Sequence, residues 1–243
     1  VHWPEGMVEY ESTEKILFSA DGFGKFGTLD TDEPWDCEAR RYYINIVGKY
    51  GTSVQALLKK AATLDVKTIC PLHGPILTED LGHYIEKYDI WSSYRPENEG
   101  VTIAYASIHG NTAIAAKKMG EILEAKGQKV SMFDLSRDDM AEAIEDSFRY
   151  DKLILAAPTY DAALFPCMED FLYHLKIKNY QKRTIGIIEN GTWAPMAGKL
   201  MKAYVEQFKD CTLVEPIVTI KSTMNEDTVK VMEELADTML QSK

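Results

Sequence analysis

The sequence predicts an α/β protein of two domains, the second of which contains a doubly wound parallel sheet of five strands. From Val101 onward, short apolar runs alternate with helical patterns, which is typical of parallel strands joined by crossover helices. A polar run containing Pro96 and Gly100 separates this part from a less regular first part. The length of 243 residues accommodates two modest domains. We therefore expect one domain at residues 1–97 and another at 98–243.

The first part contains short strand patterns followed by longer helical ones. Two stretches predict strands of a meander, and a longer stretch predicts a helix with a glycine-containing break at 48–51. A third strand and a second helix complete this part. The predicted strands cover 7–11, 15–19 and 68–71, and the predicted helices cover 38–61 and 79–91.

The second part alternates strictly between the two kinds of element. Each short apolar run is followed by a helical pattern, so five strands and five helices are expected in turn. The predicted strands cover 101–106, 129–133, 152–156, 184–188 and 213–219. The predicted helices cover 112–126, 137–148, 168–176, 195–208 and 225–240.

Composition limits the partners that the protein can have. Because 38 acidic residues outnumber 27 basic ones, the formal charge is −11. An acidic surface repels polyanions, so we expect neither nucleic acid nor a membrane as a partner. The sequence has no apolar run of the roughly 18 residues that span a bilayer and no secretory signal at its start, so a cytoplasmic location is expected. The four cysteines are too far apart in sequence to indicate a disulfide framework or a zinc knuckle.

A strand that turns into a helix through small polar residues gives the sharpest local signal. Free backbone N–H groups and the positive end of a helix at such a turn attract an anion. The turn contains no Lys or Arg, so it is neither a Walker loop nor a dinucleotide loop, and it suits a phosphate held by neutral donors. The alternative is ordinary helix capping by Asn111 or Thr112. The residues of this turn are Ser107, Ile108, His109, Gly110, Asn111 and Thr112.

Two further loops follow the third and fourth predicted strands of the second part. In a doubly wound sheet, the ligand lies over the carboxyl ends of the strands, where these loops meet. Each loop carries small residues and one large aromatic residue, Tyr160 or Trp193, which can flank a planar ring; the alternative for each is a packing role. The candidate ring-binding residues are Pro158, Thr159, Tyr160, Asp161, Leu164, Phe165, Asn190, Gly191, Thr192 and Trp193.

These motifs resemble those of a known family. The sequences S-I-H-G-N-T at 107–112, A-P-T-Y at 157–160 and N-G-T-W at 190–193 look like the flavin-binding loops of a flavodoxin domain. The whole chain resembles the flavodiiron proteins, also called A-type flavoproteins. This resemblance implies FMN as cofactor and a flavodoxin-like sheet in the order 2-1-3-4-5. It also implies that the first part is the C-terminal portion of a metallo-β-lactamase-like αββα domain.

Three residues of the first part have the chemistry of metal ligands: His2, Asp21 and His73. Carboxylate and imidazole groups together suit iron, manganese or zinc. By the resemblance, these three match catalytic ligands of a non-haem diiron centre. The family's first ligand cluster has no counterpart in the sequence, which starts at Val1, so we expect an N-terminally truncated fragment that binds iron weakly or not at all. The full-length protein would carry two irons.

The resemblance also implies an activity. An enzyme of this family reduces dioxygen to water, nitric oxide to nitrous oxide, or both, while FMN relays electrons to the iron pair. Rubredoxin or a related reductase is the expected electron donor, and a head-to-tail homodimer or tetramer is the expected assembly. Two alternatives remain open, namely a metal-free flavodoxin-type electron-transfer protein and a zinc-dependent hydrolase of the metallo-β-lactamase fold.

Overall fold

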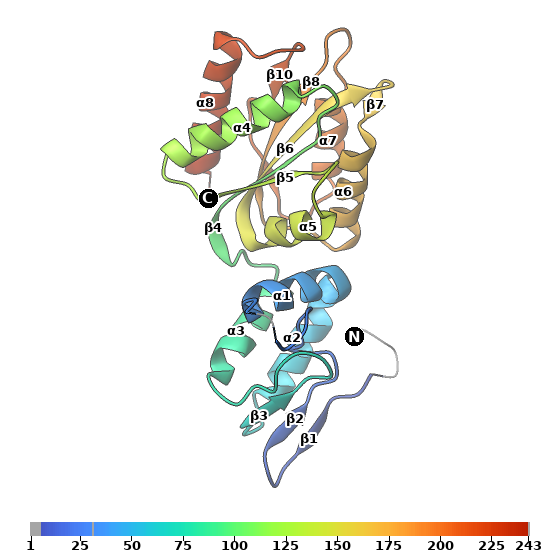
Figure 1. Cartoon of the computed structure of the whole chain (residues 1–243), viewed down its shortest axis with the longest axis vertical. Helices are drawn as coiled ribbons and strands as arrows, with labels where there is room; N and C mark the ends of the chain where they lie inside the picture. The colour runs from blue at the N-terminus through green and yellow to red at the C-terminus, as the bar shows by residue number, and fades with distance from the viewer. Residues whose placement is uncertain (1–5, 31, 243) are drawn as a thin grey trace. The chain divides into compact units, whose positions relative to one another are not determined.

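The computed structural model describes residues 6–30 and 32–242 of the chain (Figure 1). The chain divides into two compact units, one ending at Glu97 and the other beginning at Asn98. Each unit has its own sheet and its own helices. In the part of the chain that the structure describes, none of the helices combines the length and the apolarity that crossing a membrane requires.

The second unit is built on a parallel sheet of five main strands in the order β10-β8-β6-β4-β5. Numbered along the chain, this is the order 2-1-3-4-5, so the predicted doubly wound α/β fold is confirmed. Two short strands extend the sheet, β7 antiparallel to β6 and β9 parallel to β8. The strands are β4 (Asn98–Tyr105), β5 (Val130–Asp134), β6 (Tyr150–Tyr160), β7 (Ala163–Leu164), β8 (Thr184–Asn190), β9 (Thr212–Leu213) and β10 (Val218–Ile220).

The prediction of a single strand over 213–219 is wrong. The structure has β9 and β10 in this region, separated by an irregular segment that contains Pro216. Proline has no N–H group to donate to a sheet ladder, so an apolar run that contains it does not continue as one central strand. Both short strands still pair with β8, at its beginning and at its end.

Helices cover both faces of this sheet (Figure 1). Helices α4 and α8 lie together on one face, where Met119, Leu123, Leu235 and Met239 pack with Ile103 in one fully buried cluster. Helices α5, α6 and α7 pack in sequence on the other face. Burial on both faces explains why the strands are apolar throughout rather than alternating. The helices are α4 (Asn111–Ala125), α5 (Met140–Arg149), α6 (Pro166–Ile177), α7 (Ala197–Val205) and α8 (Glu226–Gln241).

The first unit has a smaller sheet of three strands, in which β2 lies between antiparallel β1 and parallel β3. The predicted glycine break coincides with a change of helix type: α1 passes into a π-helical and then a 3-10 segment before α2 begins at Gly51. The elements are β1 (Glu9–Glu11), β2 (Ile16–Phe18), α1 (Trp35–Tyr42), the π-helix Tyr43–Val47, the 3-10 helix Gly48–Tyr50, α2 (Gly51–Ala61), β3 (Thr68–Cys70) and α3 (Leu81–Ser92).

A buried ion-pair cluster closes the first unit at its last residue. The Glu97 carboxylate accepts hydrogen bonds from Arg40 at 2.9 Å, from Lys87 at 2.8 Å and from the Trp91 indole at 2.7 Å. Burial alone would raise the pKa of Glu97, but the Arg40 charge and these hydrogen bonds outweigh it and lower that pKa below its usual value. The side chains of Arg40 and Glu97 are both almost fully inaccessible, so this ion pair is a buried one.

Candidate functional site

The carboxyl ends of β4, β6 and β8 lie side by side at one edge of the larger sheet. Their parallel register aligns Tyr105 with Ala156 and Pro158 with Asn190. The three loops that sequence analysis singled out leave the sheet from this edge, which is where ligands bind in doubly wound folds.

The first loop ends in an open helix N-terminus. Helix α4 begins at Asn111, and its N-cap is Gly110, whose φ of 91° lies in the left-handed region that glycine tolerates. Among residues 6–30 and 32–242, no side chain caps this helix, and apart from Gly110 and its two chain neighbours no atom lies within 4 Å of the position that a Cβ on Gly110 would occupy. The alternative in which Asn111 or Thr112 is the N-cap is therefore wrong. The first N–H groups of the helix remain available to an anion in the space above Gly110.

Ser107 shapes this loop from within. Its hydroxyl oxygen accepts a hydrogen bond from the Gly110 N–H at 3.1 Å, which folds the loop back before the helix starts. Ile108 and His109, between these two residues, are exposed. The loop therefore offers one hydroxyl and a row of backbone donors, without any cationic side chain.

Thr112 and Asn190 turn out to be internal supports. Thr112 is 2% exposed, and its hydroxyl oxygen accepts from the Asn190 amide at 3.3 Å. Asn190 also donates to the Ser222 carbonyl at 3.0 Å and accepts from the Ser222 N–H at 3.1 Å. These bonds join the first turn of α4 and the end of β8 to the segment after β10. Sequence analysis missed Ser222. It lies 32 residues from Asn190, and no sequence pattern indicates that the two residues are in contact.

Thr159, near the end of β6, fixes the loop that follows β8 through hydrogen bonds. The Thr159 hydroxyl oxygen accepts from the backbone N–H groups of Met196 at 2.8 Å and Ala197 at 3.1 Å. A Cβ on Gly191 would lie 3.1 Å from Pro195 and 3.2 Å from the Thr159 oxygen, so the loop closes tightly only with glycine there. Thr159 therefore determines the path of the loop that carries Trp193.

A buried carboxylate, Glu189, belongs to the same assembly although the sequence did not single it out. One of its oxygens accepts from the Gly198 N–H at 2.7 Å and the other accepts from the Thr219 hydroxyl at 2.9 Å. The available signal was an acidic residue at the end of a strand that is otherwise apolar.

The two aromatic residues of the loops are exposed. Trp193 is 99% exposed and Tyr160 is 44% exposed, and the Tyr160 ring meets Phe165 edge to face at 5.6 Å. The exposure of Trp193 excludes the packing alternative for that residue. Tyr160 is held out by the two-residue turn Asp161–Ala162, in which both residues have positive φ, as a tight hairpin requires.

Burial sorts the predicted flavin-site residues into three groups that share one sheet edge. The exposed group is Ile108, His109, Gly110, Tyr160, Asp161, Thr192 and Trp193. The half-buried group is Ser107, Asn111, Thr159, Phe165 and Gly191. The buried group is Thr112, Pro158, Leu164 and Asn190.

The structure brings two of the three predicted metal ligands together in the first unit. Asp21 follows β2 and His73 follows β3, and these strands are parallel neighbours. The His73 Nε2 atom lies 3.7 Å from an Asp21 carboxylate oxygen. The third predicted ligand, His2, lies outside the described residues.

The imidazole of His73 is fixed in orientation. Its Nδ1 atom lies 2.9 Å from the Lys25 carbonyl oxygen and, because a carbonyl only accepts, Nδ1 donates this hydrogen bond while Nε2 faces Asp21. A second hydrogen bond of this kind orients metal-binding histidines generally. A Cβ on Gly24 would lie 2.5 Å from the ring, so Gly24 allows the ring its position.

Two side chains do not complete a metal centre. Among residues 6–30 and 32–242, no group of three or more His, Cys, Asp or Glu side chains is placed to hold a metal ion. An iron pair requires several more nitrogen and oxygen donors than Asp21 and His73 provide. The described residues therefore fit part of a metal centre and do not fit two irons by themselves.

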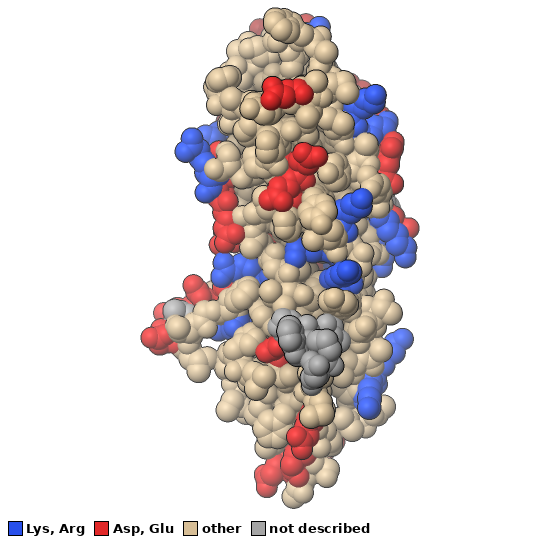
Figure 2. All heavy atoms as spheres, turned by 90° about the vertical axis from the view of Figure 1, so that its right-hand side faces the viewer, with Lys and Arg blue, Asp and Glu red and all other residues tan. Residues whose placement is uncertain are grey.

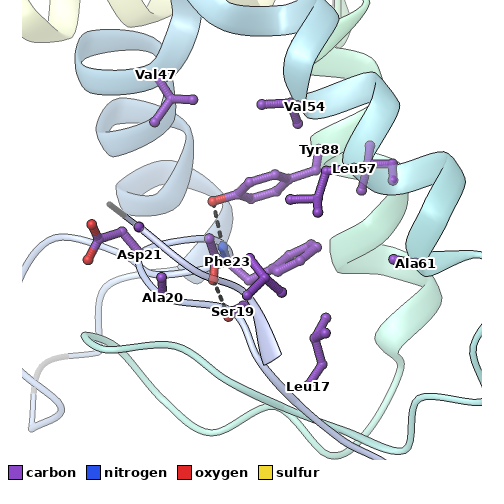
Figure 3. Close-up of a pocket in the computed structure, with 14 residues that line it drawn as sticks. Leu17, Ser19, Ala20, Asp21, Phe23, Val47, Val54, Leu57, Ala61 and Tyr88 are labelled. Atoms are coloured by element: carbon purple, nitrogen blue, oxygen red, sulfur yellow. Dashed lines mark hydrogen bonds between the residues drawn. The ribbon is translucent and has the colours of Figure 1, made fainter. Parts of the chain in front are cut away.

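An apolar cavity of about 120 Å³ lies beside the Asp21 loop (Figure 3). Leu17, Val54, Leu57 and Tyr88 line it, and the Tyr88 hydroxyl accepts from a backbone N–H of the same loop at 2.7 Å. Figure 3 shows the Asp21 carboxylate turned away from the side chains of Leu57 and Tyr88. Asp21 is thus both one of the residues that line the cavity and the partner of His73.

Charged side chains of both signs occur on the surface. Figure 2 shows Lys and Arg side chains close to Asp and Glu side chains on the face that it draws, without separation into one basic and one acidic half. A polyanion would require a continuous basic surface.

Comparison with known proteins agrees with this geometry. The sequence model of the flavodoxin domain family matches residues 102–224. A nitric oxide reductase of Moorella thermoacetica is 27% identical over 91% of this chain and 57% of its own length. A coenzyme F420H(2) oxidase of Methanothermobacter thermautotrophicus is 30% identical over 72% of this chain and 46% of its own. The chain thus spans about half the length of these curated relatives.

Solved structures share the fold over nearly the whole chain. The rubredoxin:oxygen oxidoreductase of Desulfovibrio gigas superposes with a TM-score of 0.88 over 98% of this chain and 62% of its own, at 22% identity. The flavodiiron protein of Giardia intestinalis gives a TM-score of 0.88 over 99% of this chain and 62% of its own, at 21% identity. The chain therefore carries a flavodoxin domain and belongs to the flavodiiron protein family.

Proposed function

We propose that this chain is the FMN-binding part of a flavodiiron oxidoreductase, with the flavin seated on the edge where β4, β6 and β8 end. The open N-terminus of α4, flanked by two loops that each present an exposed aromatic residue, is the observation that carries this proposal. The flavodoxin-domain match and the oxidoreductases among the relatives support it.

The residues present fit FMN in both shape and charge. The phosphate would lie above Gly110, where the Ser107 hydroxyl, the Asn111 amide and the first N–H groups of α4 can donate to it. Thr112 would contribute its N–H, since its hydroxyl already pairs with Asn190. The remaining residues of the phosphate loop are Ile108 and His109.

The ring would lie between the loops after β6 and β8. Tyr160 and Trp193 would flank it, while Thr159 and Asn190 hold the two loops through hydrogen bonds. FMN supplies electron transfer when it is bound, and this chain's residues bind it, orient it and restrict the access of water. The proposed ring-binding set is Pro158, Thr159, Tyr160, Asp161, Leu164, Phe165, Asn190, Gly191, Thr192 and Trp193.

The reaction that we propose for the whole enzyme is reduction of dioxygen to water, of nitric oxide to nitrous oxide, or both. Relatives named as a nitric oxide reductase and as an oxidase support these substrates. His2, Asp21 and His73 would be ligands of the iron pair, together with further ligands from outside the described residues. Rubredoxin or a related reductase would donate electrons, and the enzyme would be a cytoplasmic head-to-tail homodimer or tetramer that binds neither nucleic acid nor membrane.

Flavin retention tests the proposal. The chain is incubated with excess FMN, passed through a desalting column, and its flavin is quantified by absorbance after denaturation. We expect about one FMN for each chain, as one open helix N-terminus provides one phosphate site. A colourless protein after this treatment would contradict the proposal, and riboflavin, which lacks the phosphate, should be retained far less than FMN.

A further inference from the structure

Glu189 is a buried carboxylate at the flavin edge that has no cationic partner. It is 8% exposed, and its two oxygens accept from Gly198 and Thr219. Within the described ranges, no Lys, Arg or His nitrogen lies within 4 Å of it. Both contacts are ones that a carboxylate makes as an acceptor, and N–H and O–H dipoles stand here in place of a counterion.

Helix α7 receives its N-terminal cap from Glu189 and Thr159. The side chain of Met196, the N-cap residue, makes no capping hydrogen bond. Instead, Thr159 accepts hydrogen bonds from the N–H groups of Met196 and Ala197, and Glu189 accepts one from the N–H group of Gly198. The Glu189 carboxylate therefore occupies the position at which an anionic ligand would meet a helix end. Helix α4, by contrast, has no such cap.

We propose that Glu189 is a positioning residue with two effects on the flavin site. It fixes the loop that carries Trp193 by capping α7, and it places a negative charge one residue before that loop. The second effect rests on the proposed function, because it requires FMN between the loops.

The charge has a consequence for flavin reduction. When FMN takes up two electrons and one proton from solvent, its ring gains a negative charge, and a fixed negative charge nearby opposes this gain. Glu189 therefore weakens the binding of reduced FMN more than that of oxidised FMN. A neutral side chain at this position would not have this effect. In a titration, dithionite supplies the electrons and is oxidised to sulfite.

The substitution Glu189→Gln isolates the charge. Its amide oxygen can still accept from Gly198, and its amide nitrogen can donate to the Thr219 hydroxyl, so the cap persists. We expect the ratio of the dissociation constants of reduced and oxidised FMN to fall about tenfold, as one nearby charge is worth on the order of 1 kcal/mol or more in this setting. Tenfold corresponds to a rise of about 30 mV in the two-electron potential. Glu206→Gln, at the other end of α7 and exposed, is the matched control and should change the ratio less than about twofold.

The substitution Glu189→Ala tests the cap without any flavin. Removal of the acceptor should raise the hydrogen-exchange rate of the Gly198 amide in the apoprotein by about tenfold, and Glu189→Gln should leave it nearly unchanged. An unchanged rate in Glu189→Ala would overturn the cap, and an unchanged dissociation-constant ratio in Glu189→Gln would overturn the electrostatic effect. If the wild-type chain retains no FMN, the proposed function fails, while the exchange result still decides the cap.

Discussion

The flavin edge of the second unit and the Asp21–His73 pair of the first unit differ in how completely they are built. At the flavin edge, the loops are cross-linked by Thr159, Asn190 and Glu189, and the N-terminus of α4 has no side-chain cap among the described residues. In the first unit, the Asp21 and His73 side chains lie 3.7 Å apart, and the described residues contain no group of three or more possible metal ligands. The proposed flavin site uses backbone donors, so it is complete once its own loops fold. The metal site requires every ligand side chain to be present. The same chain is therefore expected to bind flavin and iron very differently.

The largest expected difference is in cofactor stoichiometry. After reconstitution with excess FMN and ferrous iron under anaerobic conditions, followed by desalting, we expect about one FMN but much less than one iron for each chain. Elemental analysis and flavin absorbance on the same sample measure both quantities. Two tightly bound irons for each chain would contradict the expected difference between the two sites, since they would show that the first unit has a complete metal centre.

The ion-pair cluster at Glu97 tests whether the two units are stabilised separately. Replacing Glu97 by Ala removes the carboxylate that faces the buried Arg40 guanidinium, and breaking a buried ion pair costs about 3–5 kcal/mol. We expect urea denaturation to show an earlier transition for the first unit and retained FMN binding by the second. Glu97→Gln keeps the volume and should cost less. Simultaneous loss of FMN binding in Glu97→Ala would show that the units unfold as one.

The same cluster predicts a pH dependence. The pKa of Glu97 is lower in the folded chain than its ordinary value, so its stabilising contribution is complete above the ordinary carboxyl pKa of about 4.3 and is lost as the pH falls through the lowered folded value. The free energy of unfolding of the first unit should decrease below about pH 4. In Glu97→Gln this decrease should be smaller, and an identical decrease in both proteins would contradict the assignment.

Thr159 tests the cross-linking of the flavin loops. The substitution Thr159→Val keeps the shape but removes the oxygen that accepts from Met196 and Ala197, and an unsatisfied buried N–H costs about 1–3 kcal/mol. We expect the dissociation constant of FMN to rise about tenfold, measured by fluorescence quenching. Thr159→Ser retains the oxygen and should bind FMN nearly as the wild type does.

The smallest effects concern two glycines of the first unit. A Cβ on Gly24 would lie 2.5 Å from the His73 ring, so Gly24→Ala should destabilise the unit by about 1–3 kcal/mol. A Cβ on Gly82, in α3, would have no atom within 4 Å, so Gly82→Ala should be neutral or stabilise by up to about 1 kcal/mol. Thermal denaturation compares the two variants, and equal effects would contradict the close packing of Gly24 against His73.

The periodic pattern of the sequence predicted the alternation of strands and helices along the chain and the three loops at the strand ends, whereas the order of the strands in the sheet came from the resemblance to the flavodoxin domain. Burial on both faces makes each strand an apolar run, and the polar turns between them stand out. The break between β9 and β10 was missed, although Pro216 was its signal. Regular elements follow from local patterns, so they can be inferred from sequence.

The supports of the site could not be inferred in this way. Glu189 and Ser222 act through hydrogen bonds to residues that are distant in the sequence, and Thr159 reaches the N-terminus of α7 across 37 residues. Such partners become visible only when the register of neighbouring strands is known. Asp21 and His73 were predicted because both follow strands at turns, and the missing ligand cluster predicted an incomplete centre; the structure adds that the two side chains lie 3.7 Å apart.

A paired titration of FMN with two variants of Gly110 tests the central claim most directly. Asn and Asp have the same shape and both tolerate positive φ, but Gly110→Asp puts a negative charge where the phosphate is proposed to lie. We expect Gly110→Asp to bind FMN at least about tenfold more weakly than Gly110→Asn, with the difference shrinking at high salt. Equal affinities for the two variants would place the phosphate elsewhere and contradict the account.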